Sequence, residues 1–444
     1  MLHFAVIAPP FISHVRALEA LAGVLLARGH RVTWIHQADV RPLLSDKRLG
    51  FHTVGGRTHP AGSLKALVAR AAQPGGPLGL RRVIQDMAAM TDMLCREGVP
   101  VLRALHVDAV IADQMEAAGG LLAEALHLPY VSVACALPVN REPDVPLPVM
   151  PWAHATDERG RKLNATSARV YDWIMQPHAR VIAAHSSAFG ITPRQTLADC
   201  LSPWAQISQT TATFDFPRSQ LPAHFHPVGP LRLPLKDEPV LELPGDDGRP
   251  FVFASLGTLQ GGRFDLFKRI ASACKALDVQ LLLAHCNRLG TQESAALKKA
   301  GATWVTGFAP QRAALAQANA AITHGGLNTV LDALEAATPM LALPIAFDQP
   351  GTAARVVHAG AGLRLMPVLA SSRAIARALR RVLHEPAFAG RANALGDDVR
   401  QSGGAELAAD IVEAATLLRQ PVLTAQPIAK AAAAAFTENH LHVE

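Results

Sequence analysis

One stretch of the chain, residues 306–351, constrains the fold more than any other. It contains two short apolar runs, Ala320–Thr323 and Met340–Leu343, which are typical of buried parallel strands. Between them, apolar residues recur at spacings of three and four, as in an amphipathic helix: Leu327, Val330, Leu331 and Leu334. A strand, a helix and a second strand in this order predict a parallel sheet in an α/β domain.

The turn that would open this helix carries groups suited to an anionic ligand. Two glycines in His324-Gly325-Gly326 let the backbone approach a ligand closely, and the free N–H groups of a helix start favour an anion. Asn328 and Thr329 add side-chain donors, and the Asp332 carboxylate can accept hydrogen bonds from a diol such as ribose. Asp348-Gln349, at the expected end of the next strand, are suited to holding sugar hydroxyls. Together these residues predict a site for a sugar attached to a diphosphate.

The same alternation of strands and helices starts twice along the chain. It starts at the apolar run His3–Ala8 and again at Phe251–Leu256, after a stretch rich in proline and charge. A chain of 444 residues is long enough for two or three domains. We therefore expect an N-terminal domain, a linker, a C-terminal domain and a low-complexity tail, at residues 1–221, 222–250, 251–420 and 421–444.

The first strands of both halves lead into polar turns. Ser255-Leu256-Gly257-Thr258 offers hydroxyl and backbone donors for phosphate. In the first half, Ser13 is a plausible helix N-cap that would place His14 in the first helical turn. Asp113 follows the apolar run Asp108–Ala112, at the end of a strand where open α/β sheets bind ligands. A histidine titrates near neutrality and suits a general base, and an aspartate can hold its tautomer, so we predict a His14–Asp113 pair.

Composition limits the partners of the chain. The net charge is +6 and the pI near 9.3, which favours acidic partners, but aromatic residues are only 5% and no nucleic-acid recognition motif is present. No apolar run is long enough to span a membrane, and the chain begins directly with a strand pattern rather than a secretory signal. Five scattered cysteines indicate reduced thiols in a cytosolic protein. The absence of an Asp-x-Asp motif predicts chemistry without a metal.

Two further segments are candidates for an acceptor pocket. Residues 60–106 are expected to be mostly helical, with an apolar stripe that includes Met87, Met90 and Met93. The stripe predicts either a packed core face or an adaptable pocket wall, since methionine fits irregular apolar ligands. The proline-rich residues 138–152 predict a long irregular loop of the kind that is often functional.

The stretch around 306–351 resembles the nucleotide-sugar signature of family 1 glycosyltransferases, which adopt the GT-B fold. The matching residues are Phe308, Pro310-Gln311, His324-Gly325-Gly326, Asn328-Thr329, Asp332, Pro339, Pro344 and Asp348-Gln349. The sequence departs from plant members in having Phe308 and Leu327 where many have tryptophan, and Asp332 where they have glutamate.

The resemblance implies two Rossmann-like domains that face each other across a cleft, with a His–Asp base pair in the first. It implies inversion at the anomeric carbon, which gives a β-glycoside from an α-linked donor, with no cofactor other than the nucleotide-sugar co-substrate. The residues expected to bind the donor's base, phosphates, ribose and sugar are Ser255, Thr258, Phe308, Ala309, Gln311, His324, Gly325, Gly326, Asn328, Thr329, Asp332, Asp348 and Gln349.

In this family a glutamine at the position of Gln349 accompanies glucose donors, so the resemblance implies UDP-glucose. Stretches such as APPFISHVRAL, VDAVIADQMEAAG and FASLGTLQG are similar to bacterial zeaxanthin glucosyltransferases, and that similarity extends to about residue 420. It implies transfer to the ring hydroxyls of the carotenoid diol, giving the mono- and diglucoside. Open alternatives are a soluble acceptor such as a macrolide or flavonoid, a GT-B nucleotide-sugar epimerase, and a catalytically silent binding protein.

A carotenoid acceptor resides in a bilayer, whereas UDP-glucose is dissolved in water. A cytoplasmic protein with no spanning helix is therefore expected to dock peripherally on the anionic inner face of the membrane, through basic residues and an apolar mouth. The predicted surface is Arg81-Arg82 with neighbouring apolar residues, namely Leu78, Leu80, Ile84 and Met87.

Overall fold

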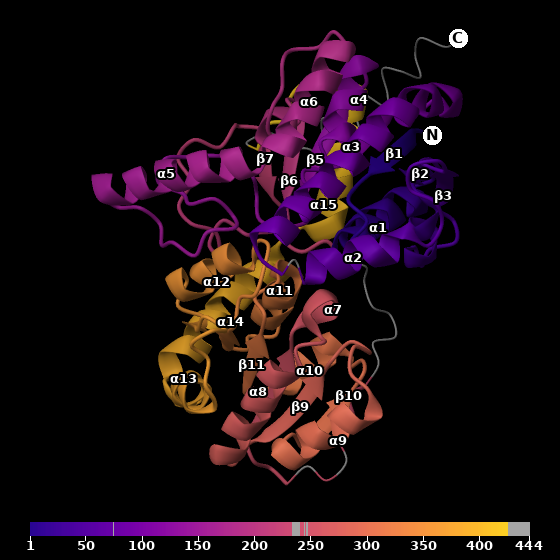
Figure 1. Cartoon of the computed structure of the whole chain (residues 1–444). Coiled ribbons are helices and arrows are strands. Elements are labelled where there is room, and N and C mark those ends of the chain that lie inside the picture. Colours follow the sequence, from indigo (N-terminus) through magenta and orange to yellow (C-terminus); the bar gives the residue numbers. More distant parts are fainter. Residues whose placement is uncertain (74, 233–239, 244, 246, 425–444) are drawn as a thin grey trace.

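The computed structural model describes residues 1–73, 75–232, 240–243, 245 and 247–424. The chain forms two stacked domains, each built on a parallel sheet with helices on both faces (Figure 1). The fold class predicted from the strand and helix patterns is therefore confirmed.

The N-terminal sheet consists of β1 (His3–Ile7), β2 (Arg31–His36), β3 (Gly50–Thr53), β4 (Ala109–Asp113), β5 (Tyr130–Ala134), β6 (Ala205–Ser208) and β7 (Phe225–Pro227). Their order across the sheet is β3-β2-β1-β4-β5-β6-β7, and every pairing is parallel. Alternate residues of β1 belong to different cores: Phe4 and Val6 pack into one, and Ala5 and Ile7 into the other. A sheet covered on both faces needs apolar residues at every position, which explains the continuous apolar runs.

The helices of this domain are α1 (Ile12–Ala27), α2 (Ser63–Ala72), α3 (Pro77–Leu105), α4 (Ala118–Ala125), α5 (Glu158–Ile174) and α6 (Gln176–Ala188), with the short 3₁₀ turns η1 (Ala38–Leu43) and η2 (Ala198–Cys200). Residues 138–152 form the irregular loop that their prolines predict. Unlike the other helices, α5 extends away from the body of the domain (Figure 1).

The C-terminal sheet consists of β8 (Phe251–Ser255), β9 (Gln280–Ala284), β10 (Trp304–Thr306), β11 (Ala320–Thr323), β12 (Met340–Ala342) and β13 (Gly362–Arg364), in the parallel order β10-β9-β8-β11-β12-β13. Its helices are α7 (Gly257–Gln260), α8 (Phe264–Ala276), α9 (Thr291–Ala300), α10 (Gln311–Gln317), α11 (Leu327–Glu335), α12 (Gln349–His358), α13 (Ser372–His384) and α14 (Pro386–Gln401). Val252 and Ala254 pack on one side of this sheet, and Phe251 and Phe253 on the other.

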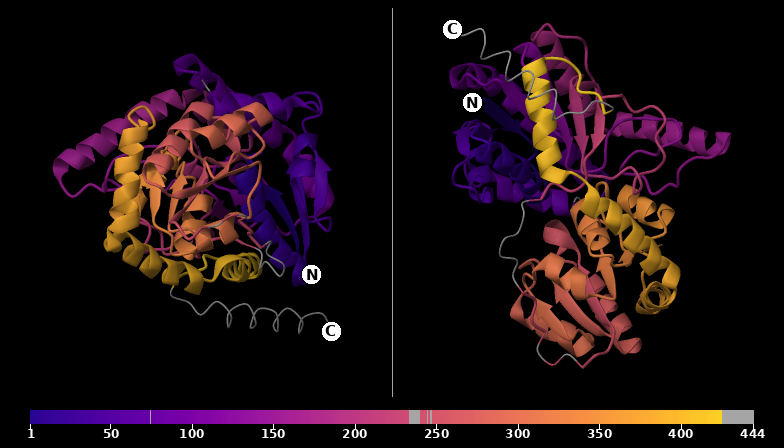
Figure 2. Two further views of the ribbon diagram at one scale, coloured as in Figure 1. Left: turned by 90° about the horizontal axis from the view of Figure 1, so that it is seen from below. Right: turned by 180° about the vertical axis from the view of Figure 1, so that it is seen from behind.

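The last described helix, α15 (Gly404–Leu418), returns to the N-terminal domain and lies along it (Figure 2). Its buried face joins the core beneath α1, and Arg28 of α1 forms ion pairs with Glu406, Asp410 and Glu413 of α15. Beyond it, the N–H of Val422 donates to the backbone oxygen of Trp204.

The domain boundaries in the structure thus differ from those expected from the sequence. The strand β7 lies inside the predicted linker 222–250, and α15 lies inside the predicted C-terminal domain 251–420, yet both belong to the N-terminal domain. A helical pattern indicates that one face is buried but not which domain covers it, so sequence periodicity alone does not reveal the return of α15. Of the predicted tail 421–444, residues 425–444 lie outside the described part of the chain.

Direct contacts hold the two domains together. Arg355 of α12 is buried and forms an ion pair with Asp215 of the N-terminal domain, with 2.5 Å between Nε and Oδ1. Arg364 donates to the backbone oxygen of Pro151 at 2.6 Å. Gly351 approaches the Pro148 carbonyl so closely that a Cβ would clash with it, so this contact requires glycine. These contacts bring the loop 138–152 against the C-terminal domain.

Candidate active site

A cavity of about 1610 Å³ lies at the carboxyl ends of both sheets, and residues of both domains line it. His14 lines it from the N-terminal domain and His324 from the C-terminal domain. The other predicted site residues also line the cavity, with two exceptions, Asp113 and Gly325. The topology thus brings residues that are hundreds of positions apart in the sequence into one site.

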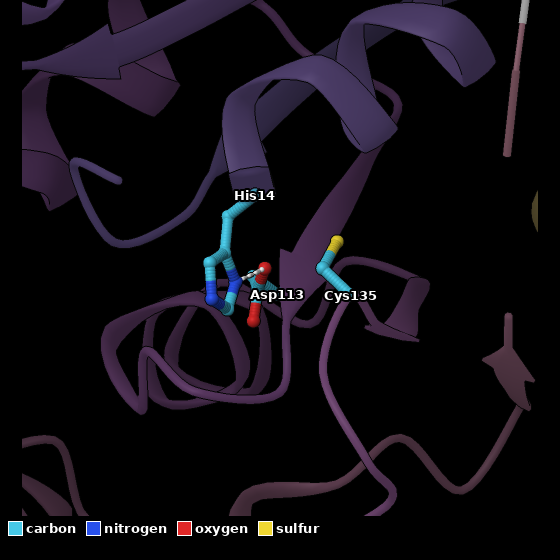
Figure 3. Close-up of side chains that lie close together, drawn as sticks. All are labelled: His14, Asp113 and Cys135. Atoms are coloured by element: carbon cyan, nitrogen blue, oxygen red, sulfur yellow. Dashed lines mark hydrogen bonds and ion pairs between the residues drawn. The ribbon is translucent and has the colours of Figure 1, made fainter. Parts of the chain in front are cut away.

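His14 and Asp113 are in direct contact, with 2.7 Å between Nδ1 and Oδ2 (Figure 3). His14 is the third residue of α1, and Asp113 is the last residue of β4 and fully buried. The contact follows from the sheet, because β1 and β4 are neighbours and Ile7 pairs with Ala112, so both chains leave the sheet at the same edge. The second oxygen of Asp113 accepts from the N–H of Met115 at 2.8 Å, which fixes the carboxylate.

The helix start that positions His14 differs in one detail from the prediction. The N-cap residue is Phe11, and no side chain caps the helix, so Ser13 is the second helical residue rather than the cap. The hydrogen bonds of the first turn instead run to the backbone oxygen of Phe11, from the N–H groups of His14 and Val15. His14 still lies in the first turn, as expected.

The surroundings of His14 make it a stronger base than a free histidine. Burial by itself lowers the pKa of an imidazole, but the nearby carboxylates of Asp113 and Asp348 outweigh this and raise the pKa of His14 above its usual value. Asp113 accepts the hydrogen bond from Nδ1 when that nitrogen is protonated, which leaves Nε2 as the atom that takes up a proton. This is the arrangement that a general base requires.

Cys135 is a third member of this cluster that the sequence did not indicate. Its Sγ, a ring nitrogen of His14 and a carboxylate oxygen of Asp113 lie within 4.8 Å of one another, a set of side chains that resembles a metal site (Figure 3). Burial and the adjacent Asp113 raise the pKa of the Cys135 thiol, which favours its protonated form. The separation of 2.7 Å between His14 Nδ1 and Asp113 Oδ2 is that of a hydrogen bond, so these two groups bond each other directly.

On the opposite side of the cavity, His324 follows β11. Burial lowers the pKa of His324 to about 4, so the ring is neutral at physiological pH. Its Nδ1 is buried and has no hydrogen-bond partner among the described residues. A buried, unpartnered ring nitrogen in a cavity wall is suited to a polar ligand.

The glycines around His324 make room for its ring. A Cβ on Gly257 would lie 2.7 Å from the imidazole, and Gly326 approaches the ring equally closely. Gly325 has a φ of +80°, and its N–H donates to Thr323 Oγ1 at 3.1 Å. Gly325 thus shapes the turn and does not line the cavity, and its role in donor binding stays a prediction. Gly326 lines the cavity as the N-cap of α11.

Asp332, predicted to bind ribose, is held by two neighbours. Gln311 Nε2 donates to Oδ2 at 2.7 Å, and the guanidinium of Arg232 donates to Oδ1 at 3.1 and 2.9 Å. Arg232 lies between the domains, also contacts the side chain of Gln209 at 3.3 Å, and lines the cavity. Arg232 belongs to no motif and lies inside the expected linker, so it could not be picked out from the sequence.

Asp348 and Gln349 lie at the start of α12, six residues beyond the end of β12, and not at a strand end as predicted. Gln349 Oε1 accepts from the N–H groups of Ile345 and Ala346, at 2.9 and 2.8 Å, which closes the loop before the helix. Asp348 Oδ2 accepts from the N–H of Leu137 in the other domain at 3.4 Å. Burial raises the pKa of Asp348 above its usual value.

The half of the cavity in the N-terminal domain is mostly apolar. Its walls come from α3, α6 and the loop 138–152, and they include Val83, Ile84, Met87, Met90, Leu147, Val149 and Ile182. Both predictions for the methionine stripe thus hold in part: Met93 is in the core, Met90 is in the core and lines the cavity, and Met87 is half-buried in its wall. Ile84, which was predicted to belong to a membrane-docking surface on α3, is buried and therefore cannot be part of that surface. Leu78 and Leu80 of the same prediction are exposed.

Comparison with known proteins agrees with this arrangement. The model of the family “UDP-glucoronosyl and UDP-glucosyl transferase” matches residues 6–396. The chain is 51% identical over 434 residues to the zeaxanthin glucosyltransferase of Pantoea ananas, covering 97% of this chain and 100% of the relative. It is 44% identical over 417 residues to that of Pseudescherichia vulneris, covering 94% and 98%.

Similar solved structures include the glycotransferase of kitacinnamycin, with a TM-score of 0.72 and 19% identity, covering 93% of this chain and 98% of that one. The calicheamicin glycosyltransferase CalG4 aligns with a TM-score of 0.69 and 21% identity, covering 94% and 99%. These similarities confirm the predicted GT-B fold.

Proposed function

The chain belongs to the family of UDP-glucuronosyl and UDP-glucosyl transferases, and from this we propose that it transfers glucose from UDP-glucose to the ring hydroxyls of zeaxanthin with inversion. The observation that carries the proposal is the single cavity shared by the His14–Asp113 pair and the turn at His324. The identity of 51% to a zeaxanthin glucosyltransferase supports the choice of acceptor.

The acceptor half of the cavity suits a carotenoid diol. Zeaxanthin is a long hydrocarbon with one hydroxyl on each terminal ring, and apolar walls favour the burial of such a chain. A terminal ring that enters between α3 and α6 brings its hydroxyl toward His14, which lines the same cavity. Because the two ends of zeaxanthin are equivalent, release and re-entry of the monoglucoside gives the diglucoside.

The transfer is a direct displacement. The hydroxyl oxygen attacks C1 of glucose while His14 Nε2 takes the hydroxyl proton, and the bond between C1 and the phosphate oxygen breaks to release UDP. Attack from the face opposite the leaving group converts the α-linked donor into a β-glycoside. Asp113 stabilises the imidazolium that forms, since it accepts the Nδ1 hydrogen bond. Base catalysis of this kind contributes about 10²–10⁴ in rate.

The diphosphate is held by the C-terminal domain without a metal in this proposal. The start of α11, His324, Ser255 and Thr258 all line the cavity, and their N–H groups, ring and hydroxyls are the expected donors to the diphosphate. A helix terminus contributes about 0.3–1 kcal/mol, and up to ~2 when partly buried, whereas each hydrogen bond to a charged group contributes about 1.5–3 kcal/mol. The hydrogen bonds therefore account for most of the donor's stabilisation. Arg232 also lines the cavity, where it is paired with Asp332.

The site also bears on the alternatives. A soluble acceptor such as a macrolide or flavonoid is the second candidate, because relatives at 23% and 26% identity carry the names NDP-glycosyltransferase YjiC and 4'-demethylrebeccamycin synthase. An epimerase needs no acceptor, so the large apolar half of the cavity argues against it. The intact His14–Asp113 pair argues against a silent binding protein.

Incubation with UDP-glucose and zeaxanthin in detergent micelles, followed by mass spectrometry, tests the proposal. The expected products carry one and two added hexoses. Turnover of UDP-glucose with a soluble panel but not with zeaxanthin would assign the enzyme to the second candidate.

No helix of the described chain has the length and apolar character needed to cross a bilayer. We place the protein at the cytoplasmic side of the membrane, peripherally bound, because one substrate is dissolved in water and the other in lipid. The net charge of +6 supports contact with anionic lipid.

A further inference from the structure

The helix α5 buries unusually few of its residues for a helix of a globular domain. It projects from the N-terminal domain in two views (Figures 1 and 2). Of its residues, all of which the structure describes, only Asn164 is buried. A surface helix normally buries a continuous apolar stripe, so α5 presents to solvent a face that most helices cover.

The exposed face of α5 carries large apolar side chains in a line. Leu163, Val170 and Trp173 are 44%, 51% and 73% exposed, and with Thr166 they recur at spacings of three and four along one side of the helix. Trp152 lies beside this helix, since its Nε1 donates to Ser167 Oγ at 3.0 Å, and it is 36% exposed. A gathered apolar surface of this kind marks an interaction site rather than ordinary scattered exposure.

Basic side chains accompany the apolar line. α5 carries four basic and two acidic residues. Arg161 pairs with Asp144, and Lys162 lies 3.7 Å from Glu158. Arg159 and Arg169, on the same face as the apolar line, have no carboxylate partner within the residues that the structure describes. An apolar stripe with tryptophan and flanking arginine is the composition of helices that lie in the interface of an anionic bilayer.

The base of α5 belongs to the acceptor cavity. Val170 and Trp173 line the same cavity as His14, as does Leu80 of α3, and the neighbouring Leu78 is 79% exposed. The apolar line therefore runs from the free end of α5 to the mouth of the cavity. A lipid-dissolved acceptor that reaches this mouth moves along apolar side chains and does not cross water.

We propose that α5 is the membrane-docking element of the enzyme, and that it lies in the interface of an anionic bilayer with its Leu163–Trp173 face in contact with lipid. This inference rests on the proposed function, since it supplies the route by which a carotenoid reaches His14. It moves the main docking surface from Arg81-Arg82 to α5, with the start of α3 as the second side of the mouth. The basic flank selects anionic lipid over a neutral surface.

Flotation with vesicles tests the docking surface. Leu163→Asp and Arg159→Glu are suitable variants, because neither residue lines the cavity. Val368→Asp is the matched control, since Val368 is 87% exposed in the C-terminal domain and also lies outside the cavity wall. We expect the wild type to float with phosphatidylglycerol vesicles and not with phosphatidylcholine vesicles. The double variant should bind at least tenfold more weakly, with the control unchanged.

Glucosylation assays separate this inference from the proposed function. The double variant should glucosylate zeaxanthin in detergent micelles at the wild-type rate but lose activity toward zeaxanthin embedded in vesicles. Unchanged flotation of the double variant overturns the docking role of α5, whatever the assays give. Failure of the wild type to glucosylate zeaxanthin in micelles overturns the proposed function instead. A dimer that Leu163→Asp dissociates in light scattering, with vesicle binding unaltered, would assign the face to a second copy of the chain.

Discussion

Asn328, at the start of α11, donates a hydrogen bond from Nδ2 to the backbone oxygen of Ser13, the residue before His14, at 3.2 Å. Its Oδ1 accepts from Gln209 of the N-terminal domain at 3.1 Å. One side chain of α11 thus contacts the turn that carries His14. These two hydrogen bonds join the C-terminal half of the site directly to the turn beside His14.

The pH dependence of the reaction should report the His14–Asp113 contact. Deprotonated His14 is the active form, so kcat/KM should rise with pH through the pKa of His14, which lies above 6.5 because Asp113 and Asp348 outweigh burial. Asp113→Asn removes the larger carboxylate contribution and lowers this pKa, so the rising limb should move to lower pH while the maximum rate falls. Rate profiles of both proteins between pH 5 and 9 check this. A variant whose rising limb stays in place would show that Asp113 does not act through His14.

The neutral state of His324 gives a contrasting prediction. Because burial lowers its pKa to about 4, His324 should bind the donor as a neutral ring, and donor affinity should show no titration of this residue between pH 5 and 8. His324→Ala should raise the KM for UDP-glucose about tenfold or more, as expected for loss of a hydrogen bond of about 1.5–3 kcal/mol to a charged group. Isothermal titration with UDP at several pH values measures the donor affinity of both proteins, and steady-state kinetics give the KM for UDP-glucose. Loss of kcat with unchanged UDP affinity would place His324 outside the donor site.

Arg232 should matter for donor binding although no motif contains it. Arg232→Ala removes the guanidinium that holds Asp332 and leaves that buried carboxylate with Gln311 alone, so Asp332 should no longer be oriented for ribose. We expect a higher KM for UDP-glucose with a smaller change in kcat, and partial recovery in Arg232→Lys. Steady-state kinetics of the two variants separate these effects. Equal kinetics of the wild type and Arg232→Ala would restrict the arginine to a structural role.

Removal of divalent ions should leave the enzyme active. The diphosphate is held by hydrogen bonds in this account, and burial together with Asp113 raises the pKa of the Cys135 thiol. Activity after EDTA treatment and desalting should therefore remain within about twofold of the untreated enzyme, and Cys135→Ser should stay active. Loss of activity that only one added ion restores would identify a metal at the cluster of His14, Asp113 and Cys135 or at the diphosphate.

Local patterns in the sequence predict much of the fold. The strands and the turn before α11 follow from apolar runs and glycine placement within a few residues, and the structure confirms them. The contact between His14 and Asp113 was also predicted, because parallel strands bring their carboxyl ends to one edge of the sheet; its geometry is confirmed. The catalytic roles of both residues stay predictions.

Features that depend on packing between distant segments could not be predicted in this way. The return of α15, the contact of Arg232 with Asp332 and the placement of Cys135 involve single residues or faces whose partners are far away in the chain. The apolar line on α5 has the spacing of an ordinary core-facing stripe, and only the exposure of Leu163, Val170 and Trp173 in the structure distinguishes it.

The most direct test of the account is the rate of glucosyl transfer by His14→Ala, measured beside its affinity for UDP. Without the imidazole, the hydroxyl proton has no acceptor, so kcat should fall by about 10²–10⁴ while the dissociation constant of UDP stays within about twofold. A His14→Ala enzyme that glucosylates zeaxanthin at nearly the wild-type kcat would contradict the central claim that His14 is the base.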